Sequence, residues 1–375
     1  MLSCDHPVVQ TCCCHPLAPG RRRFLTGLAV GAGLSVIGRS ARAQVAPLSP
    51  AELRLVPALR PAAPAAIGLV RRIDVHHHPV PPAYEQAVSA RAGLAGPLRG
   101  WSPEKSLADM DRAGVATAML SIPAAGLWLP DVAANRRLAR SCNEYVAGLV
   151  QRYPGRFGFW AALPLPDVEG SLQELAYATE MLHADGAGLF TVYGSKWLGD
   201  ASFAPLFAEL NRRGAVVFIH PTTGACCGNL IPGVPEPVIE YATDTARTIA
   251  SLLFSGAAAR YPNPKLIFCH AGGTMPTLIE RFVLLSRQPN MAKVTPDGVL
   301  PLLGRFYYDV AQTANPEALG PLMRVVPASQ VVFGTDYPYR TSIEQVAGLA
   351  GCGFSDTQLT AIGRGNVLQL VPRLR

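Results

Sequence analysis

Histidine and aspartate residues follow several apolar runs of this chain, and these two residue types together can bind a metal ion. His76 and His78 end the first run, and residues two apart in an extended strand point to the same side. Two later runs end in His220 and His270, and Asp336 directly follows a third. Two or three imidazoles with one carboxylate suit zinc, manganese or iron(II) and leave a position open. We therefore predict a divalent ion bound by His76, His78, His220 and Asp336, with His270 beside it. Zn²⁺ is the expected ion, although the residue types do not choose among Zn²⁺, Mn²⁺ and Fe²⁺.

Each of these residues also has an ordinary structural interpretation. A single histidine at a strand end is more often structural than metal-binding, and three histidines in a row can be a chance tract. Reactive residues at four separate strand ends are harder to explain by chance. Cysteine ligands are not required, because Cys226 and Cys227 are adjacent rather than two apart. Five cysteines follow residue 43, so at least one of them stays unpaired.

Eight short apolar runs bounded by turn residues predict buried parallel strands. They are 71–78, 116–122, 157–163, 187–193, 215–220, 265–270, 306–310 and 331–335. The predicted helices include 132–152, 171–184, 203–213, 244–261 and 275–287. This alternation predicts an α/β fold of the (β/α)8 TIM-barrel type over residues 70–375, with its chemistry at the carboxyl ends of the strands. An open doubly wound sheet is the alternative, but no Gly-x-Gly-x-x-Gly turn follows the first strand.

Residues 1–43 have the three parts of an export signal. The segment Arg21–Leu25 precedes an apolar stretch, Leu28–Ile37, and Ala41–Ala43 fits the small-x-small cleavage pattern. The arginine pair, one spacer and Phe-Leu resemble the twin-arginine signal, which exports folded proteins. An uncleaved anchor is the alternative, but the stretch is shorter than the ~20 residues of a membrane span. We expect a periplasmic protein without stable membrane insertion, its Ala/Pro-rich linker at 44–69 leading to the barrel.

The composition excludes two broad classes of protein. With 49% apolar and 16% charged residues, the chain can bury a large core, unlike disordered chains. The net charge of +7 includes the first 43 residues, which hold five arginines and one aspartate. The remaining charge is small, and no clustered basic or aromatic-basic motif accompanies it. We therefore expect no nucleic-acid partner.

The motifs at the strand ends resemble those of the amidohydrolase superfamily. Asp-x-His-x-His at 74–78, His220, His270 and Gly-Thr-Asp-Tyr-Pro at 334–338 carry this resemblance, which covers nearly all of 71–375. The stretches 244–256, 260–262 and 270–276 are similar to the aminocarboxymuconate-semialdehyde decarboxylase branch. Within that branch, the opening 72–78 and the segment 240–247 look closest to the methylsalicylate and resorcylate decarboxylase type.

The resemblance also implies the number of metal ions. Superfamily members with two metals generally supply a carbamylated lysine from the end of the fourth strand. Here that end reads Phe-Thr-Val-Tyr-Gly over 190–194, and Lys196 lies beyond it. The resemblance thus favours one metal and leaves His270 to act on substrate or water.

The activity implied by the resemblance is non-oxidative decarboxylation of a small aromatic ortho-hydroxy carboxylic acid. Asp336 would then be both a metal ligand and a proton carrier, while His270 would orient or polarise the substrate. Arg247 is the candidate partner for the substrate carboxylate, although a helix-surface or subunit-contact role fits it equally well. The family also implies a homodimer.

Two other functions remain open at this point. A metal-dependent hydrolase of an amide, lactone or related bond would use the same ligands to activate a water molecule. A binding protein that has lost catalysis would keep the fold alone, although every expected ligand residue is present. The residue types do not separate the lyase from the hydrolase.

Overall fold

The computed structural model describes residues 71–375 except 91–92, 125 and 128. The predicted export signal at 1–43 and the linker at 44–69 lie outside the described residues. Within the described ranges, no helix has both the length and the apolar character that crossing a lipid bilayer requires.

Eight parallel strands form one sheet in the order β1-β2-β3-β4-β7-β8-β9-β10. They are β1 Arg72–His77, β2 Val115–Leu120, β3 Phe157–Ala162, β4 Gly186–Phe190, β7 Val216–His220, β8 Lys265–Phe268, β9 Tyr307–Asp309 and β10 Val331–Val332. Backbone bonds join the last strand region to the first: Val75 N–H donates to Phe333 O at 3.0 Å, and His78 N–H donates to Tyr337 O at 2.8 Å. The predicted barrel is confirmed.

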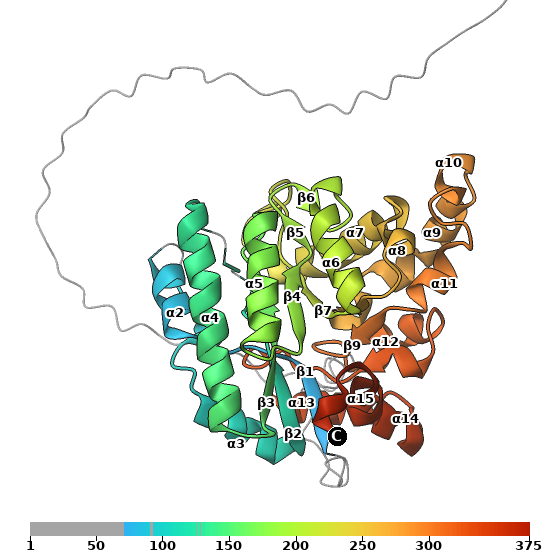
Figure 1. Cartoon of the computed structure of the whole chain (residues 1–375). Helices are drawn as coiled ribbons and strands as arrows, with labels where there is room; N and C mark the ends of the chain where they lie inside the picture. Colours follow the sequence, from blue (N-terminus) through green and yellow to red (C-terminus); the bar gives the residue numbers. More distant parts are fainter. Residues whose placement is uncertain (1–70, 91–92, 125, 128) are drawn as a thin grey trace, which may run out of the picture. The chain divides into compact units, whose positions relative to one another are not determined.

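Helices surround this sheet on its outer side (Figure 1). Those between β1 and β7 are α2 Pro82–Ser89, α3 Pro103–Ala113, α4 Val132–Arg152, α5 Val168–Glu180 and α6 Ala204–Arg213. Those that follow are α7 Glu240–Phe254, α8 Ala257–Arg260, α9 Ile279–Ser286, α10 Pro289–Ala292, α11 Val299–Leu303, α12 Pro316–Met323, α13 Ser342–Ala350, α14 Asp356–Thr360 and α15 Asn366–Leu370. Side-chain caps start several of them, since Asp131, Asp167 and Asn315 each accept a first-turn N–H.

The strands bury side chains on both faces, as nearly continuous apolar runs predict. Large rings fill the interior: Trp160 and Phe218 stack with centroids 6.2 Å apart, and Trp160 Nε1 donates to Val75 O at 2.9 Å. A second, larger apolar layer lies between the strands and the helices, where residues such as Leu206 and Leu252 are fully buried. This packing fixes the strand ends that carry the reactive residues.

Several predicted elements were longer than the observed ones, and two of them extend into a second element. The predicted strand 187–193 ends at Phe190, and a separate antiparallel hairpin follows, with β5 Val192–Tyr193 paired to β6 Lys196–Trp197. Gly194 turns the chain in the left-handed region, at φ 68°. The predicted helix 244–261 is likewise divided between α7 and α8, because Gly256 adopts φ 76°.

Candidate metal centre

The structure brings His76, His78, His220 and Asp336 together at the carboxyl ends of the strands. Their ligand atoms all lie within 4.8 Å of one another, and all four residues are buried. His76 belongs to β1, His220 ends β7, and Asp336 follows β10. The barrel thus unites the four residues that the strand-end pattern predicted as ligands.

Hydrogen bonds at Nδ1 decide which ring nitrogen of two histidines can bind a cation. His78 Nδ1 lies 2.9 Å from Ser121 O, and His220 Nδ1 lies 2.7 Å from Pro221 O. A carbonyl oxygen only accepts, so each Nδ1 carries the hydrogen and each Nε2 keeps a lone pair. His220 Nε2 is buried without a hydrogen-bond partner among the described residues, and burial lowers the pKa of this imidazole well below 6.5. This unpartnered atom is suited to a metal.

His76 is oriented by a carboxylate that lies behind it. His76 Nδ1 lies 2.8 Å from Asp309 Oδ2, which leaves Nε2 facing the other ligands, 3.1 Å from His78 Nε2. Burial lowers the pKa of His76, but the Asp336 and Asp309 carboxylates contribute to a larger opposite effect and the pKa lies well above 6.5. The cluster therefore attracts a positive charge to this nitrogen.

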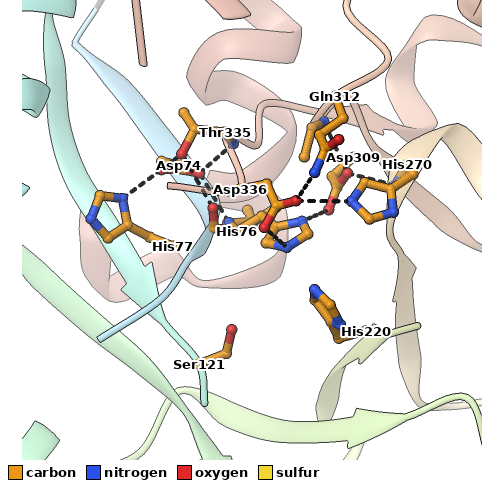
Figure 2. Close-up of polar contacts among 12 residues, drawn as sticks. Asp74, His76, His77, Ser121, His220, His270, Asp309, Gln312, Thr335 and Asp336 are labelled. Atoms are coloured by element: carbon orange, nitrogen blue, oxygen red, sulfur yellow. Dashed lines mark hydrogen bonds and ion pairs between the residues drawn. The ribbon is translucent and has the colours of Figure 1, made fainter. Parts of the chain in front are cut away.

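Asp336 directs its two oxygens to different partners. Oδ1 lies 3.0 Å from His78 Nε2 and 3.2 Å from His76 Nε2, whereas Oδ2 lies 3.4 Å from His270 Nε2 and accepts a hydrogen bond from Gln312 Nε2. Figure 2 shows Gln312 and His270 approaching this carboxylate. Burial raises the pKa of Asp336, but the histidines outweigh it and hold the pKa well below 3.8. The carboxylate is therefore ionised at neutral pH.

The arrangement of these donors fits one divalent ion. Atoms that each lie about 2.0–2.2 Å from a common ion are about 2.8–3.6 Å apart when the angle between them at the ion is between 90° and the tetrahedral angle. The separations of 3.0–3.2 Å among His76 Nε2, His78 Nε2 and Asp336 Oδ1 agree with this. Lone pairs facing a carboxylate repel one another unless a cation or proton lies between them. The donor set therefore accommodates a metal.

A second group of potential ligands, His76, Cys269 and Asp309, also lies close together. It shares His76 with the first group, and His76 Nδ1 is already hydrogen-bonded to Asp309. Burial raises the pKa of the Cys269 thiol well above 9, so the thiolate that a metal requires does not form near neutral pH. Lys196, the lysine that lies beyond the fourth strand, is exposed on β6, and its Nζ lies 3.3 Å from Ser202 Oγ. Both observations agree with a single-metal site.

The residues around the ligands hold β1 in place. Asp74 accepts hydrogen bonds from His76 N–H and Thr335 N–H, each at 3.0 Å. His77 points away from the site, with Nδ1 3.0 Å from Asp74 Oδ2 and Nε2 2.9 Å from Ser106 Oγ. Of the three adjacent histidines, His77 is thus the structural one, as the two-residue period of a strand predicts.

A cavity of about 180 Å³ opens beside the ligands. Its lining includes His220, His270 and Asp336, together with Tyr241 and Tyr339. Within the part of the chain that the structure describes, His270 Nε2 is buried without a hydrogen-bond partner, and it lies 3.4 Å from Asp336 Oδ2. The structure thus brings the predicted catalytic residues to a space for a small molecule.

Arg247, predicted to bind the substrate carboxylate, is not brought to this cavity. Its guanidinium lies 3.4 Å from Glu240 Oε2 and 3.6 Å from Asp244 Oδ1, and it is not part of the described cavity lining. Asp244 lies three residues before it on α7, a spacing that places both on one helix face. These carboxylates already compensate the charge, so this structure gives the predicted role no support.

Two residues near the end of β9 were missed by sequence reasoning. Asp309 contacts both the ligand His76, through Oδ2, and the backbone of His270. The His270 N–H donates to Asp309 Oδ1 at 2.8 Å. Gln312 reaches Asp336 from the following loop. An aspartate at the end of a buried strand was a usable signal for the first, because buried carboxylates need partners. The contact of Gln312 depends on a left-handed backbone, at φ 56°, which residue type does not reveal.

The sequence matches known proteins over the whole barrel. The profile of the family described as Amidohydrolase matches residues 73–373. The decarboxylase yanB of Aspergillus niger is 39% identical over 324 residues, which cover 81% of this chain and 88% of the relative. The 6-methylsalicylic acid decarboxylase of Penicillium expansum is 37% identical over 317 residues, covering 81% of this chain and 97% of the relative.

Solved structures share the fold at lower identity. A 2,6-dihydroxybenzoate decarboxylase complexed with 2,6-dihydroxybenzoate superposes with a TM-score of 0.70 at 20% identity, covering 80% of this chain and 99% of that one. A dihydroxybenzoic acid decarboxylase from Polaromonas sp. JS666, solved with manganese and 2-nitroresorcinol, gives a TM-score of 0.68 at 21% identity, covering 81% and 97%.

Proposed function

This chain belongs to the amidohydrolase family, and from this premise we propose that it is a metal-dependent decarboxylase of a small aromatic ortho-hydroxy carboxylic acid. The observation that carries the proposal is the convergence of His76, His78, His220 and Asp336 beside a small cavity. Relatives at 37–39% identity are decarboxylases, one of them of 6-methylsalicylic acid. Monocyclic ortho-hydroxybenzoates such as 6-methylsalicylate are therefore the first substrates to test.

The chain's own residues supply binding and a proton. A divalent ion held by the four ligands would supply a Lewis acid and a template for the carboxylate and hydroxyl oxygens. Loss of CO2 leaves the electron pair of the broken bond on the ring carbon, which then needs a proton. The His270–Asp336 pair provides it, with Asp336 ionised and the imidazole Nε2 positioned to hold the hydrogen. The pair regains a proton from solvent.

A direct assay separates the lyase from the hydrolase. The metal-loaded protein is incubated with 6-methylsalicylate and 2,6-dihydroxybenzoate, and separately with lactones and amides, while CO2 and acid release are followed. We expect CO2 from the hydroxybenzoates, one phenol for each CO2, and no hydrolysis. Acid release from a lactone or amide without CO2 would assign the site to the hydrolases instead.

The metal itself is proposed to be zinc or manganese. Three imidazoles and one carboxylate suit both ions, and zinc is the usual ion in such a set. Manganese is present in the related fold of the Polaromonas enzyme. Metal analysis of the purified protein, followed by reloading with each ion, identifies the one that restores the higher kcat.

We propose that residues 1–43 export the folded enzyme to the periplasm. The support is the arginine pair at Arg21 and Arg22 with its following apolar stretch and cleavage pattern. Fused to a folded reporter, this segment should deliver the reporter to the periplasmic fraction, and replacing both arginines by lysine should stop delivery. A reporter that remains in the cytoplasm with the native segment would refute the proposal.

We infer that the enzyme forms a homodimer. Several large apolar side chains are exposed in the segment between β7 and α7, including Leu230, Ile231 and Val238. Exposed apolar side chains grouped on one segment are typical of protein contacts. Because Pro237 and Tyr241 line the cavity, such a contact would lie near the active site.

A further inference from the structure

We propose that Gln312 is a positioning residue that makes Asp336 a one-oxygen ligand and reserves its second oxygen for catalysis. The inference rests in part on the proposed function, because only a decarboxylase would use that second oxygen as described above. Gln312 was predicted neither as a metal ligand nor as a catalytic residue. Four contacts on the two sides of one carboxylate carry it.

The two oxygens of Asp336 face two separate environments. Oδ1 faces the ligand nitrogens of His76 and His78, at 3.2 and 3.0 Å. Oδ2 faces His270 Nε2 and the amide of Gln312. A free carboxylate can rotate and bind an ion through both oxygens. A hydrogen bond to Oδ2 opposes this rotation, so Gln312 holds the carboxylate in the divided arrangement (Figure 2).

Gln312 is itself held in an unusual conformation. Its φ is 56°, in the left-handed region that residues other than glycine rarely adopt. The adjacent Ala311 N–H donates to Asp309 Oδ1 at 3.0 Å, the same oxygen that accepts from His270 N–H. Asp309 therefore anchors the backbone beside both partners of Oδ2. Strained residues that the surrounding structure retains are concentrated at functional sites.

The substitution Gln312→Met tests this role, because methionine keeps the length of the side chain and removes the N–H donor. We expect the affinity for Mn²⁺ to be unchanged or higher, since Oδ2 is then free to bind as well. We expect kcat to fall about 10–100-fold, the usual cost of losing a partner outside the ligand shell, while KM changes little. The visible spectrum of the Co²⁺-substituted protein, which reports coordination, should change.

Two further variants complete the experiment. Gln312→His places a donor nitrogen at a similar reach and should recover part of the lost kcat and of the native Co²⁺ spectrum. Gln173→Met, on the exposed face of α5, is the matched control and should leave Mn²⁺ affinity, kcat and the spectrum unchanged.

Three results would overturn the proposal: a native Co²⁺ spectrum and kcat in Gln312→Met, a loss of Mn²⁺ affinity in that variant, or a Gln312→His variant no better than Gln312→Met. A wild-type protein inactive on every hydroxybenzoate would refute the proposed reaction instead. The Mn²⁺ affinity and the Co²⁺ spectrum would still decide the role of Gln312, because neither requires turnover.

Discussion

At the scale of single residues, His220 offers a direct test of the metal centre. Its Nε2 is buried and has no hydrogen-bond partner in the described ranges, so a metal ion is the partner that would satisfy it. His220→Ala should reduce the bound metal to well below one ion per chain and reduce kcat by more than 100-fold. Elemental analysis of the purified variant measures the first effect and the CO2 assay the second.

The control for His220→Ala is His77, which stands between the predicted ligands His76 and His78 in the sequence. His77 is bound to Asp74 and Ser106 and faces away from the cluster. His77→Gln should therefore keep one metal ion per chain while lowering stability by about 1–3 kcal/mol, the cost of disturbing buried hydrogen bonds. Full metal content in His220→Ala, or metal lost in His77→Gln, would contradict the assignment of ligands.

Asp309 is expected to act on the metal through His76. In Asp309→Asn, one oxygen is replaced by an NH2 group, which donates hydrogen bonds and accepts none. The remaining oxygen can face either His76 Nδ1 or the backbone N–H groups of His270 and Ala311, but not both. Such losses typically cost 10–100-fold in metal affinity. Titration of the metal-free variant with Zn²⁺ against a competing chelator measures the change. An unchanged affinity would show that His76 needs no orienting partner.

The ligands and their neighbours differ in how readily sequence reveals them. His76 and His78 follow from the two-residue period of a strand, and Asp336 from its place after the last strand. Asp309 was not predicted, although an aspartate at the end of a buried strand needs a partner, and here that partner is the ligand His76. Arg247 was predicted as a substrate partner from its place near the expected site, and in the structure acidic residues on its own helix compensate its charge.

At the scale of elements, Asp167 couples the start of α5 to α4. Its carboxylate accepts from Gly170 N–H at 3.1 Å and from Arg136 Nη2 at 3.0 Å. The hydrogen bond from Arg136 outweighs burial and holds the pKa of Asp167 below 3.8. A carboxylate whose folded pKa lies below its unfolded value stabilises the fold above the unfolded pKa, and this stabilisation is lost as the pH falls through the folded pKa.

The variant Asp167→Asn isolates this charge, because asparagine is also a good helix cap. We expect wild type to be the more stable at pH 7 by at most about 1 kcal/mol, since the pair is partly exposed. The difference should shrink as the pH falls below about 4. Thermal melts of both proteins between pH 7 and 3 measure it, and a difference that grows in acid would have the wrong sign.

Element types were predicted better than element ends. The helix 132–152 was predicted with the bounds that the structure shows, because its apolar period is long and Asp131 caps it. The fourth strand was extended past its end at Phe190 to Tyr193, and the helix after β7 was extended past Gly256. Gly256 adopts a left-handed conformation, and a glycine inside an apolar run does not by itself reveal that it turns the chain.

At the scale of the whole molecule, metal binding should stabilise the barrel. The ligands come from β1, β7 and the segment after β10, so an ion bound to them connects distant parts of the chain. An ion present at 100 times its Kd, and not bound by the unfolded chain, contributes about 2.7 kcal/mol. The Tm should fall after treatment with a chelator and recover when metal is restored. Equal Tm values with and without metal would refute a folded-state site.

Charged substitutions in the exposed apolar segment between β7 and α7 test whether two subunits associate there. Light scattering should give the mass of a dimer for the native protein. Replacing Ile231 and Val238 by aspartate introduces charges on exposed side chains and should yield monomers without lowering the Tm. A native monomer, or a dimer unaffected by both substitutions, would place any contact elsewhere.

The hydrogen bonds that join the first and last strands have a consequence for when the protein becomes active. His76 and His78 are among the first described residues to be synthesised, and Asp336 is among the last, yet His78 N–H is bonded to Tyr337 O beside the ligands. While the ribosome is still making the final strand, the nascent chain contains only the three histidines among the four predicted ligands. We therefore expect metal acquisition to follow release of the complete chain, and prematurely terminated products that lack Asp336 to remain free of metal.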